Sequence, residues 1–275
     1  MMYTAPAPFR DALDAHGIRS LLPTTGRTAD LQLLESALKR RAMFSATVAI
    51  AEPLQQIQSG VTAILEGATD QASVRLAIKQ LWERLGYVPD PEQAGGLQDL
   101  SSTRRINLQI ETNVATARGA GWYEQGQQPA VLDEFPAQEL YRASTPAGGA
   151  AAERDWPARW EKAGGVFYGE RMIARKDDPV WQNLGDPALF PDGLGNPWPP
   201  FAFNSGMRVR DIGRDEAQEL GVIGADEQVA PQPLDLDADL QATPELRQGW
   251  LQQAIEDSGL GTFQNGVLSF AGGAA

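Results

Sequence analysis

The sequence contains no cysteine and a single histidine, His16, and these two shortages exclude several kinds of site. Without cysteine the chain has no disulfide, no thiolate metal ligand and no cysteine nucleophile. A histidine-rich metal centre or a Ser-His-Asp triad would have to be built around His16 alone. We therefore expect no metal site, no cofactor site and no catalytic residues, and predict that the protein is not an enzyme.

Long apolar runs are also missing. No stretch approaches the ~20 consecutive apolar residues that a membrane-spanning helix needs. The first residues, "MMYTAPAPFRDALDAHG", include acids and lack the apolar segment of a signal peptide. The sequence thus predicts no membrane partner, and a protein that is kept in a cytoplasm or packed into a particle assembled there.

Positive charge is in short supply. The 275 residues include 23 Lys and Arg against 36 Asp and Glu, which gives a formal net charge of -13. Such a surface repels the phosphate backbone, so binding of DNA over a broad face is disfavoured, although a local basic patch remains open. The apolar content of 42% is typical of a globular protein with a core.

The first half of the chain has the pattern of helices. Residues 1–26 are rich in Pro, Ala and Thr and predict an extended arm with one short helix near its end. Residues 28–67 have apolar side chains three or four positions apart, which predicts a helical run that Pro53 breaks or kinks.

Two further helices have clear start signals. Asp70 is placed to cap a helix over 70–86, which puts Val74, Ile78, Leu81 and Leu85 on one face. Ser101 or Ser102 is placed to cap a third helix that ends near Gly126.

After residue 130 short strands alternate with short helices. The strands are expected at 139–145, 165–169, 171–176 and 207–212, and the helices at 154–165, 177–185 and 213–222. From 224 onward the chain is acidic and rich in Pro and Gln, with one more helix at 244–257 and a plain tail. We predict an α+β protein with a helical N-terminal half, a small mixed α+β domain and an extended C-terminal arm. The expected divisions are 1–26, 27–130, 131–223 and 224–275.

Several polar motifs have both a chemical and a structural interpretation. Asp177 and Asp178 could hold a divalent metal or act as an acid and a base, but one of them capping the helix opened by Pro179, with the other facing water, is favoured. The acids of "LDLDADL", at 235, 237 and 239, lack the glycine and glutamate of a calcium loop and favour a solvated linker. Arg104 and Arg105 are candidates for surface salt bridges or a contact with a partner protein.

Aromatic residues gather between residues 156 and 203. Core packing is favoured over a ligand platform for the four tryptophans, because a small α+β unit needs large side chains to fill its interior. They are Trp156, Trp160, Trp181 and Trp198. In "GNPWPPFAFNSGMRVRDI" we expect Trp198, Phe201 and Phe203 to be core anchors, while Pro197, Pro199 and Pro200 keep the loop extended.

Three stretches occur in an order that resembles the phage head morphogenesis family, which includes Mu F-like and SPP1-like minor head proteins. They are "RRINLQIETNVATARGAGWYEQG", "RDWPARWEKAGGVFYGERMIARKDDPVW" and "GNPWPPFAFNSGMRVRDI" followed by "GRDEAQELGV". The resemblance covers residues 101–223. Family members end this domain with a Pro-Pro loop, an Asn-Cys-Arg-Cys motif and a strand.

In this sequence Pro199 and Pro200 match the Pro-Pro pair and Asn204 matches the asparagine. Ser205 and Met207 stand at the cysteine positions, on either side of Gly206, and the usual histidine of the loop is missing. A metal or redox role of those residues in relatives therefore does not transfer to this chain. The resemblance implies a structural loop that comprises Trp198, Pro199, Pro200, Phe201, Asn204, Ser205, Gly206 and Met207.

The resemblance further implies a low-copy virion protein at the portal vertex or inside the head. Its partners would be the portal protein, the major capsid protein or both, with packaged DNA as a weaker candidate. Two other functions stay open. One is an ADP-ribosyltransferase-like or other transferase domain that uses Arg142 with Glu153, Glu161 or Glu170. The other is a DNA-binding factor inside the head, which the acidic balance disfavours.

Overall fold

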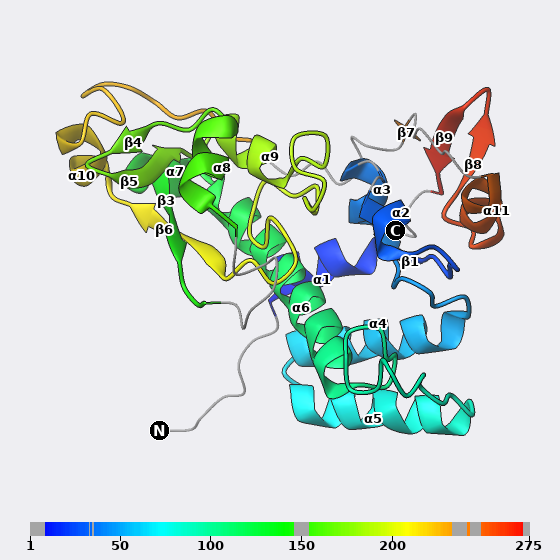
Figure 1. Cartoon of the computed structure of the whole chain (residues 1–275). Helices are drawn as coiled ribbons and strands as arrows, with labels where there is room; N and C mark the ends of the chain where they lie inside the picture. The colour runs from blue at the N-terminus through cyan, green and yellow to red at the C-terminus, as the bar shows by residue number, and fades with distance from the viewer. Residues whose placement is uncertain are drawn as a thin grey trace. The chain divides into compact units, whose positions relative to one another are not determined.

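The computed structural model describes residues 9–32, 34, 36–145, 154–232, 241–242 and 249–271 (Figure 1). The fold is mixed α+β, which confirms the predicted class. The chain forms two compact units. Unit 1 consists of Met1–Arg118 together with Leu236–Ala275, and unit 2 is the continuous segment Gly119–Asp235.

Unit 1 is mainly helical. Its larger core lies among α1 (Arg10–Gly17), α4 (Ala51–Leu65), α5 (Gln71–Arg84) and the first part of α6 (Thr103–Gly126). Helices α4 and α5 run side by side in Figure 1. In the described residues, no helix combines the length and the apolar content that crossing a bilayer requires.

The start signals of α5 and α6 work as predicted. The side chain of Asp70 accepts a hydrogen bond from the Ser73 amide at 2.8 Å, and Ser102 Oγ accepts one from the Arg105 amide at 3.1 Å. Three of the four predicted apolar side chains of α5 are buried, whereas Leu85 at its C-terminal end is 39% exposed.

The predicted helical run over 28–67 is wrong in its middle. It is divided into α2 (Thr28–Gln32), α3 (Ser36–Arg41), the short strand β2 (Ala42–Met43) and α4. Strand β2 leaves the helical path because it pairs in parallel with β1 (Ser20–Leu21). Pro53 neither breaks nor kinks a helix. It lies in the first turn of α4, where its missing N–H costs nothing.

The described part of the predicted N-terminal arm is folded. Helix α1 and strand β1 occupy most of residues 10–21, and Ala12 and Leu22 are fully buried. Apolar residues at these positions therefore belong to the core of unit 1.

The C-terminal segment is folded where the structure describes it, and this corrects the predicted extended arm. Helix α11 (Gly249–Asp257) is followed by a hairpin of β8 (Gly261–Gln264) and β9 (Val267–Phe270), and β7 (Gln241–Ala242) pairs with β9. Helix α11 and the hairpin share a second core with the N-terminal region of unit 1. Its buried members are Leu22, Leu31, Leu34, Leu38, Ala42, Leu251, Ile255, Leu260, Leu268 and Phe270.

Unit 2 is built on an antiparallel sheet of four strands in the order β4-β5-β3-β6. The strands are β3 (Ala137–Arg142), β4 (Phe167–Tyr168), β5 (Arg171–Arg175) and β6 (Met207–Ile212). Neighbouring residues of a strand point to opposite faces, and both faces carry a core. Leu140 of β3 belongs to one core and Ala137 to the other.

Among the described residues of unit 2, four helices belong wholly to this unit. Helices α8 (Trp156–Lys162) and α9 (Val180–Gly185) contribute to the aromatic core on one face, and α10 (Arg214–Glu219) to the smaller core on the other. Helix α7 (Pro129–Glu134) precedes β3. The unit boundary falls between Arg118 and Gly119, inside α6, and differs from the predicted boundary at 130.

Candidate functional site

The loop of residues 195–207, which we call the brace loop, is mostly buried. Phe201 is 0% exposed and Trp198 is 5% exposed, as expected for core anchors. Phe203 is 41% exposed, so its predicted role as a third anchor is wrong. Phe203 and Asn204 form a turn, and side chains at a turn commonly face water.

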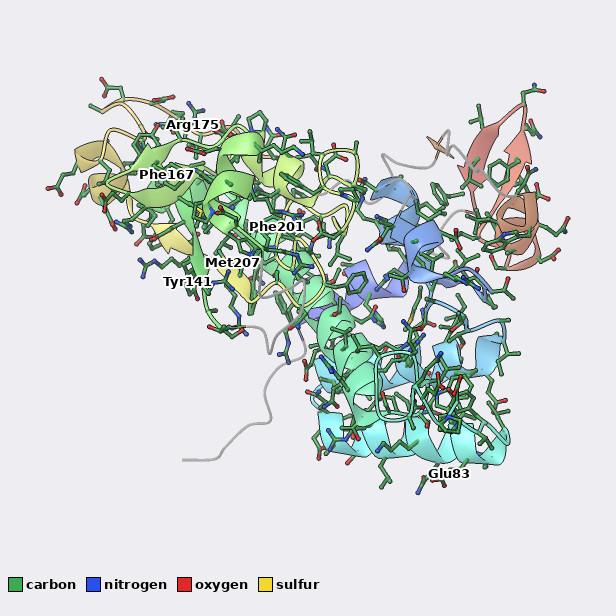
Figure 2. The ribbon with its side chains drawn as sticks, viewed as in Figure 1. Glu83, Tyr141, Phe167, Arg175, Phe201 and Met207 are labelled. Atoms are coloured by element: carbon green, nitrogen blue, oxygen red, sulfur yellow. The ribbon has the colours of Figure 1, made fainter. Side chains whose placement is uncertain are left out.

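Phe201, which is labelled in Figure 2, packs against other aromatic rings inside unit 2. Its ring stacks on Trp181 with centroids 6.4 Å apart, and Trp181 meets Trp160 edge-on at 5.3 Å. The indole N–H groups of Trp160 and Trp181 donate to the carbonyls of Val166 and Arg175. The tryptophans therefore act as the core of unit 2, in agreement with the favoured interpretation.

Backbone contacts hold the brace loop against the preceding turn. The Leu194 amide donates to the Phe201 carbonyl at 3.0 Å, and Gly193 and Ala202 form an antiparallel bridge. Gly185 lies where a Cβ would come within 2.1 Å of the Asn196 carbonyl oxygen, so only glycine allows this close approach. Pro199 and Pro200, joined by a cis peptide bond, lie within this fixed segment.

The end of the brace loop is a tight turn into β6. Asn204 and Gly206 have positive φ angles of 50° and 67°, a region that Asn and Gly tolerate best. Ser205 is buried, and its hydroxyl accepts a hydrogen bond from the amide of the buried Met207 at 3.3 Å. The Gly206 carbonyl accepts from the Ala143 amide after β3. The residues that the resemblance singles out thus have structural roles.

The brace loop also contacts the part of α6 that belongs to unit 2. Tyr123 and Trp198 pack with ring centroids 5.2 Å apart. At Gly119 the helix backbone comes so close that a Cβ would lie 2.3 Å from the Pro199 carbonyl oxygen and 2.5 Å from Trp198 Cδ1. Because both neighbours are fixed, glycine is required at residue 119.

We expect Gly119→Ala to lower the free energy of unfolding by about 2 kcal/mol, because the strain of overpacking exceeds the gain of alanine over glycine in a helix. Gly126→Ala on the same helix is the matched control, since its Cβ would meet only the flexible Lys176 Nζ at 3.6 Å. Urea denaturation of both variants measures the difference. Equal stability of the two would show that α6 does not depend on close contact with Pro199.

Neither Asp177 nor Asp178 is arranged as a metal ligand or a catalytic pair. Asp178 Oδ1 accepts from the Val180 amide at the start of α9, at 2.8 Å, as the capping interpretation predicts. Asp177 does not face water, which corrects the other half of that prediction. Its carboxylate forms an ion pair with Arg175 and accepts from the Ala230 amide at 3.1 Å.

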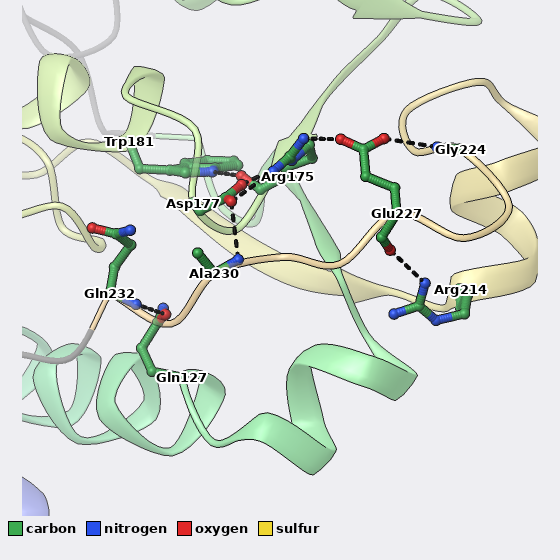
Figure 3. A network of polar contacts seen from close by, with 9 residues as sticks. All are labelled: Gln127, Arg175, Asp177, Trp181, Arg214, Gly224, Glu227, Ala230 and Gln232. Carbon is green, nitrogen blue, oxygen red and sulfur yellow. Dashed lines mark hydrogen bonds and ion pairs between the residues drawn. The ribbon is translucent and has the colours of Figure 1, made fainter.

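Residues 224–232 form a strap that is fastened to unit 2 by polar contacts, shown in Figure 3. Glu227 pairs with Arg175, and its carbonyl accepts from Arg214 at 3.0 Å. At the far end the Gln232 amide donates to Gln127 Oε1 at 2.7 Å. The described start of the predicted acidic linker is therefore part of unit 2.

The sheet of unit 2 also carries a buried acid between two arginines, on the face of the smaller core and opposite the aromatic core. Glu139 Oε2 accepts from Arg171 Nη2 at 2.6 Å and from Arg210 Nε at 2.8 Å. Burial alone would raise the pKa of Glu139, but these hydrogen bonds lower it below its usual value. The guanidinium of Arg210 also lies 5.6 Å from the centroid of the Tyr141 ring. Glu139 is thus paired with both arginines, and Arg171 forms a further ion pair with Glu216.

The two arginines proposed for partner contact lie in different surroundings. Arg104 is exposed on α6, so its contact with a partner stays a prediction. Arg105 is buried, and its guanidinium donates to the Leu97 carbonyl at 3.0 Å and to Ser45 Oγ at 2.9 Å. Arg105 therefore ties two loops to α6 inside unit 1, which corrects its assignment to an outer surface.

The transferase residues are not assembled into a site in the described residues. Arg142, Glu161 and Glu170 are all exposed, and no ion pair joins them in this part of the chain. Glu153 and the acids at 235, 237 and 239 lie outside the described residues. Within the described ranges no group of three or more His, Asp and Glu residues could hold a metal ion.

A cluster that the sequence analysis missed surrounds Asp192, after α9. Arg154 Nε donates to Asp192 Oδ2 at 2.6 Å, and Arg159 Nη1 donates to Oδ1 at 2.8 Å. Burial alone would raise the pKa of Asp192, but the hydrogen bonds and charges of the two arginines lower it. Arg154 and Arg159 are five residues apart in the sequence, whereas Asp192 is more than thirty residues away, so no local pattern indicated this cluster.

The contacts described above brace and connect the elements of unit 2. Comparison with protein-family models, with curated proteins and with solved structures finds no match for this chain in any of the three.

Proposed function

We propose that this protein is a minor head protein of a tailed bacteriophage or prophage, associated with the portal and acting in head assembly, genome packaging or ejection. The observation that carries the proposal is the ordered set of three motifs between residues 101 and 223. The proposal places the protein in the virion, at the portal vertex or inside the head.

The contacts between the motifs support the proposal. The end of α6 meets the brace loop through Gly119 and Tyr123, and Trp181 of the second motif stacks on Phe201 of the third. The C-terminal part of the first stretch, from Gly119 onward, therefore packs with the other two stretches in unit 2, whereas its first part belongs to unit 1. The buried brace loop is also what a structural interpretation of the motif requires.

The direct test is co-expression of the chain with a portal protein of the same phage or prophage genome, followed by purification of the portal and sizing of the complex. We expect the chain to co-purify with the portal and to be found in purified particles by mass spectrometry. A chain that neither binds portal nor enters particles would rule the proposal out.

The partner contact assigned to Arg104 can be tested in the same assay. We expect Arg104→Glu to weaken portal binding about tenfold, because it reverses a charge at an exposed position of α6. Arg84→Glu on α5 is the matched control, since it makes the same change at another exposed helix position. If both variants bind portal normally, the contact lies elsewhere, although the proposed function would stand.

A further inference from the structure

Strand β6 forms one border of the sheet in unit 2, because β3 is the only strand that pairs with it in the described residues (Figure 1). It is six residues long, whereas β4 at the other border has two. Arg208, Arg210 and Asp211 of β6 are exposed, and Val209 is half-buried. A border strand of this length offers an edge along which a further strand can pair.

The register of β3 and β6 shows which backbone groups face outward. Gly206 lies opposite Ala143, one step before β6, and its carbonyl accepts a hydrogen bond from the Ala143 amide at 2.8 Å. Hydrogen-bonded and non-hydrogen-bonded pairs alternate along an antiparallel ladder, so every second residue after Gly206 directs its backbone groups to β3. The residues between them, Met207, Val209 and Asp211, direct theirs away from the sheet.

Most of these outward groups have no partner. The Met207 amide donates to Ser205 Oγ, which agrees with its outward direction. The amides of Val209 and Asp211 and the Val209 carbonyl have no hydrogen-bond partner within the described ranges. A row of such groups on an exposed edge is the template that β-strand addition uses.

The side chains of β6 select the charge of a partner strand. Arg208 and Arg210 lie on the same face, because alternate residues of a strand share a face. Arg208 forms no ion pair in the described part of the chain, and the side chain of Arg210 is 57% exposed although it pairs with Glu139. The acid of β6, Asp211, lies on the other face and pairs with Lys176 at 2.8 Å. An incoming strand therefore meets two arginines, at the positions where cross-strand side chains come closest.

A second copy of β6 fits this edge poorly. When two copies pair in antiparallel orientation about Val209, Arg208 of each copy lies opposite Arg210 of the other. Like charges directly opposite each other destabilise a sheet, so the arginines disfavour self-association and favour an acidic strand.

We propose that the outer edge of β6 binds an extended acidic segment of a partner protein, which pairs antiparallel to β6. Its backbone bonds to the outward groups of Val209 and Asp211, and two of its carboxylates, two positions apart, face Arg208 and Arg210. The residue between them is apolar, because it lies beside Val209 on the face of the aromatic core. This edge is present whether or not the partner is the portal, so its failure to bind would leave the proposed function standing.

The test is a titration of the full chain, labelled with ¹⁵N, with the peptide acetyl-Thr-Val-Glu-Val-Glu-Val-Thr-amide. We expect saturable binding with a Kd below about 1 mM, and about tenfold slower hydrogen exchange of the Val209 and Asp211 amides. The amides of Arg208 and Arg210 already donate to β3 and should change little. The same peptide with lysine in place of both glutamates should bind about tenfold more weakly.

Two variants separate the backbone contribution from the charge contribution. Val209→Pro deletes an outward N–H that β3 does not use, so the ladder is kept and binding should be lost. Val209→Ala is its control, since it keeps the N–H and should change binding by less than about threefold. Arg208→Ser should weaken binding about fivefold. Arg142→Ser is the matched control, because it makes the same change at an exposed position on the other face of the sheet.

Four outcomes would overturn the proposal. If no peptide slows exchange of the Val209 and Asp211 amides, the arginines only keep other strands away. If the lysine peptide binds as tightly as the glutamate peptide, the charge of the partner is wrong. If the chain dimerises in sedimentation and Val209→Pro abolishes the dimer, the occupant is a second copy. If the peptide binds only after the acids at 235, 237 and 239 are replaced by serine, the occupant is that segment of the chain itself.

Discussion

Phe201→Ala is expected to lower the free energy of unfolding by about 4 kcal/mol, which is the usual cost of replacing a fully buried phenylalanine by alanine. Phe201 is 0% exposed and stacks on Trp181, which in turn contacts Trp160. The substitution would leave a cavity next to two rigid indoles that cannot collapse into it. Chemical denaturation followed by tryptophan fluorescence and circular dichroism measures the change.

Phe203→Ala is the matched control, because it makes the same substitution two residues later in the same loop. Phe203 is 41% exposed, so we expect its loss to change stability by no more than about 0.5 kcal/mol. A large effect at residue 203 with a small one at 201 would mean that the brace loop is turned the other way. The proposed function would then lose its structural support.

Acid is expected to destabilise the protein by about 2 kcal/mol between pH 7 and pH 5 through His16 alone. Burial lowers the pKa of His16 from 6.5 to about 4. A hydrogen bond to the Gln58 carbonyl opposes this shift, while the charge of Arg19 adds to it. Because the pKa is lower in the folded state, the unfolded chain binds the proton first as the pH falls below 6.5. Stability therefore decreases until about pH 4, where the folded state is protonated as well.

A change in stability between pH 7 and pH 5 can be assigned to His16, because it is the only histidine of the sequence and no other side chain ordinarily titrates in that range. The protonated ring would also place a second N–H at Nδ1, a buried atom that has no partner among the described residues. His16→Gln should remove most of the change in unfolding free energy between pH 7 and 5. An equally steep pH dependence in that variant would show that His16 is solvated in the folded protein.

Elements that depend on local signals were predictable. The carboxylate of Asp70 and the hydroxyl of Ser102 each satisfy a free amide at a helix start, and such a signal needs only three or four residues. Asp155 caps α8 in the same way, and β6 occupies the predicted residues 207–212. The strand predicted at 139–145 is shifted, since β3 spans Ala137–Arg142, where it pairs with the full length of β6. The burial of Phe201 and Trp198 followed from their size and from the rigid prolines around them.

Features that depend on distant partners were not predictable. Arg105 looks like a surface residue from its neighbours, and only the loops that carry Ser45 and Leu97 supply the acceptors that allow its burial. The cluster around Asp192 depends on residues more than thirty positions apart. The C-terminal hairpin had a local signal that was overlooked. Asn265 and Gly266, with φ angles of 52° and 81°, are the residue pair that favours a tight turn between two strands.

The second core of unit 1 joins residues that precede unit 2 in the sequence to residues that follow it. This order in the sequence sets an order for folding during synthesis. Leu22 and Leu38 are translated early, but Leu251, Ile255 and Leu268, which cover them, emerge from the ribosome only after all of unit 2. Unit 2 is a continuous segment and can fold before that core exists. A nascent chain stalled before α11 would therefore leave the early leucines exposed to chaperones and to other apolar surfaces.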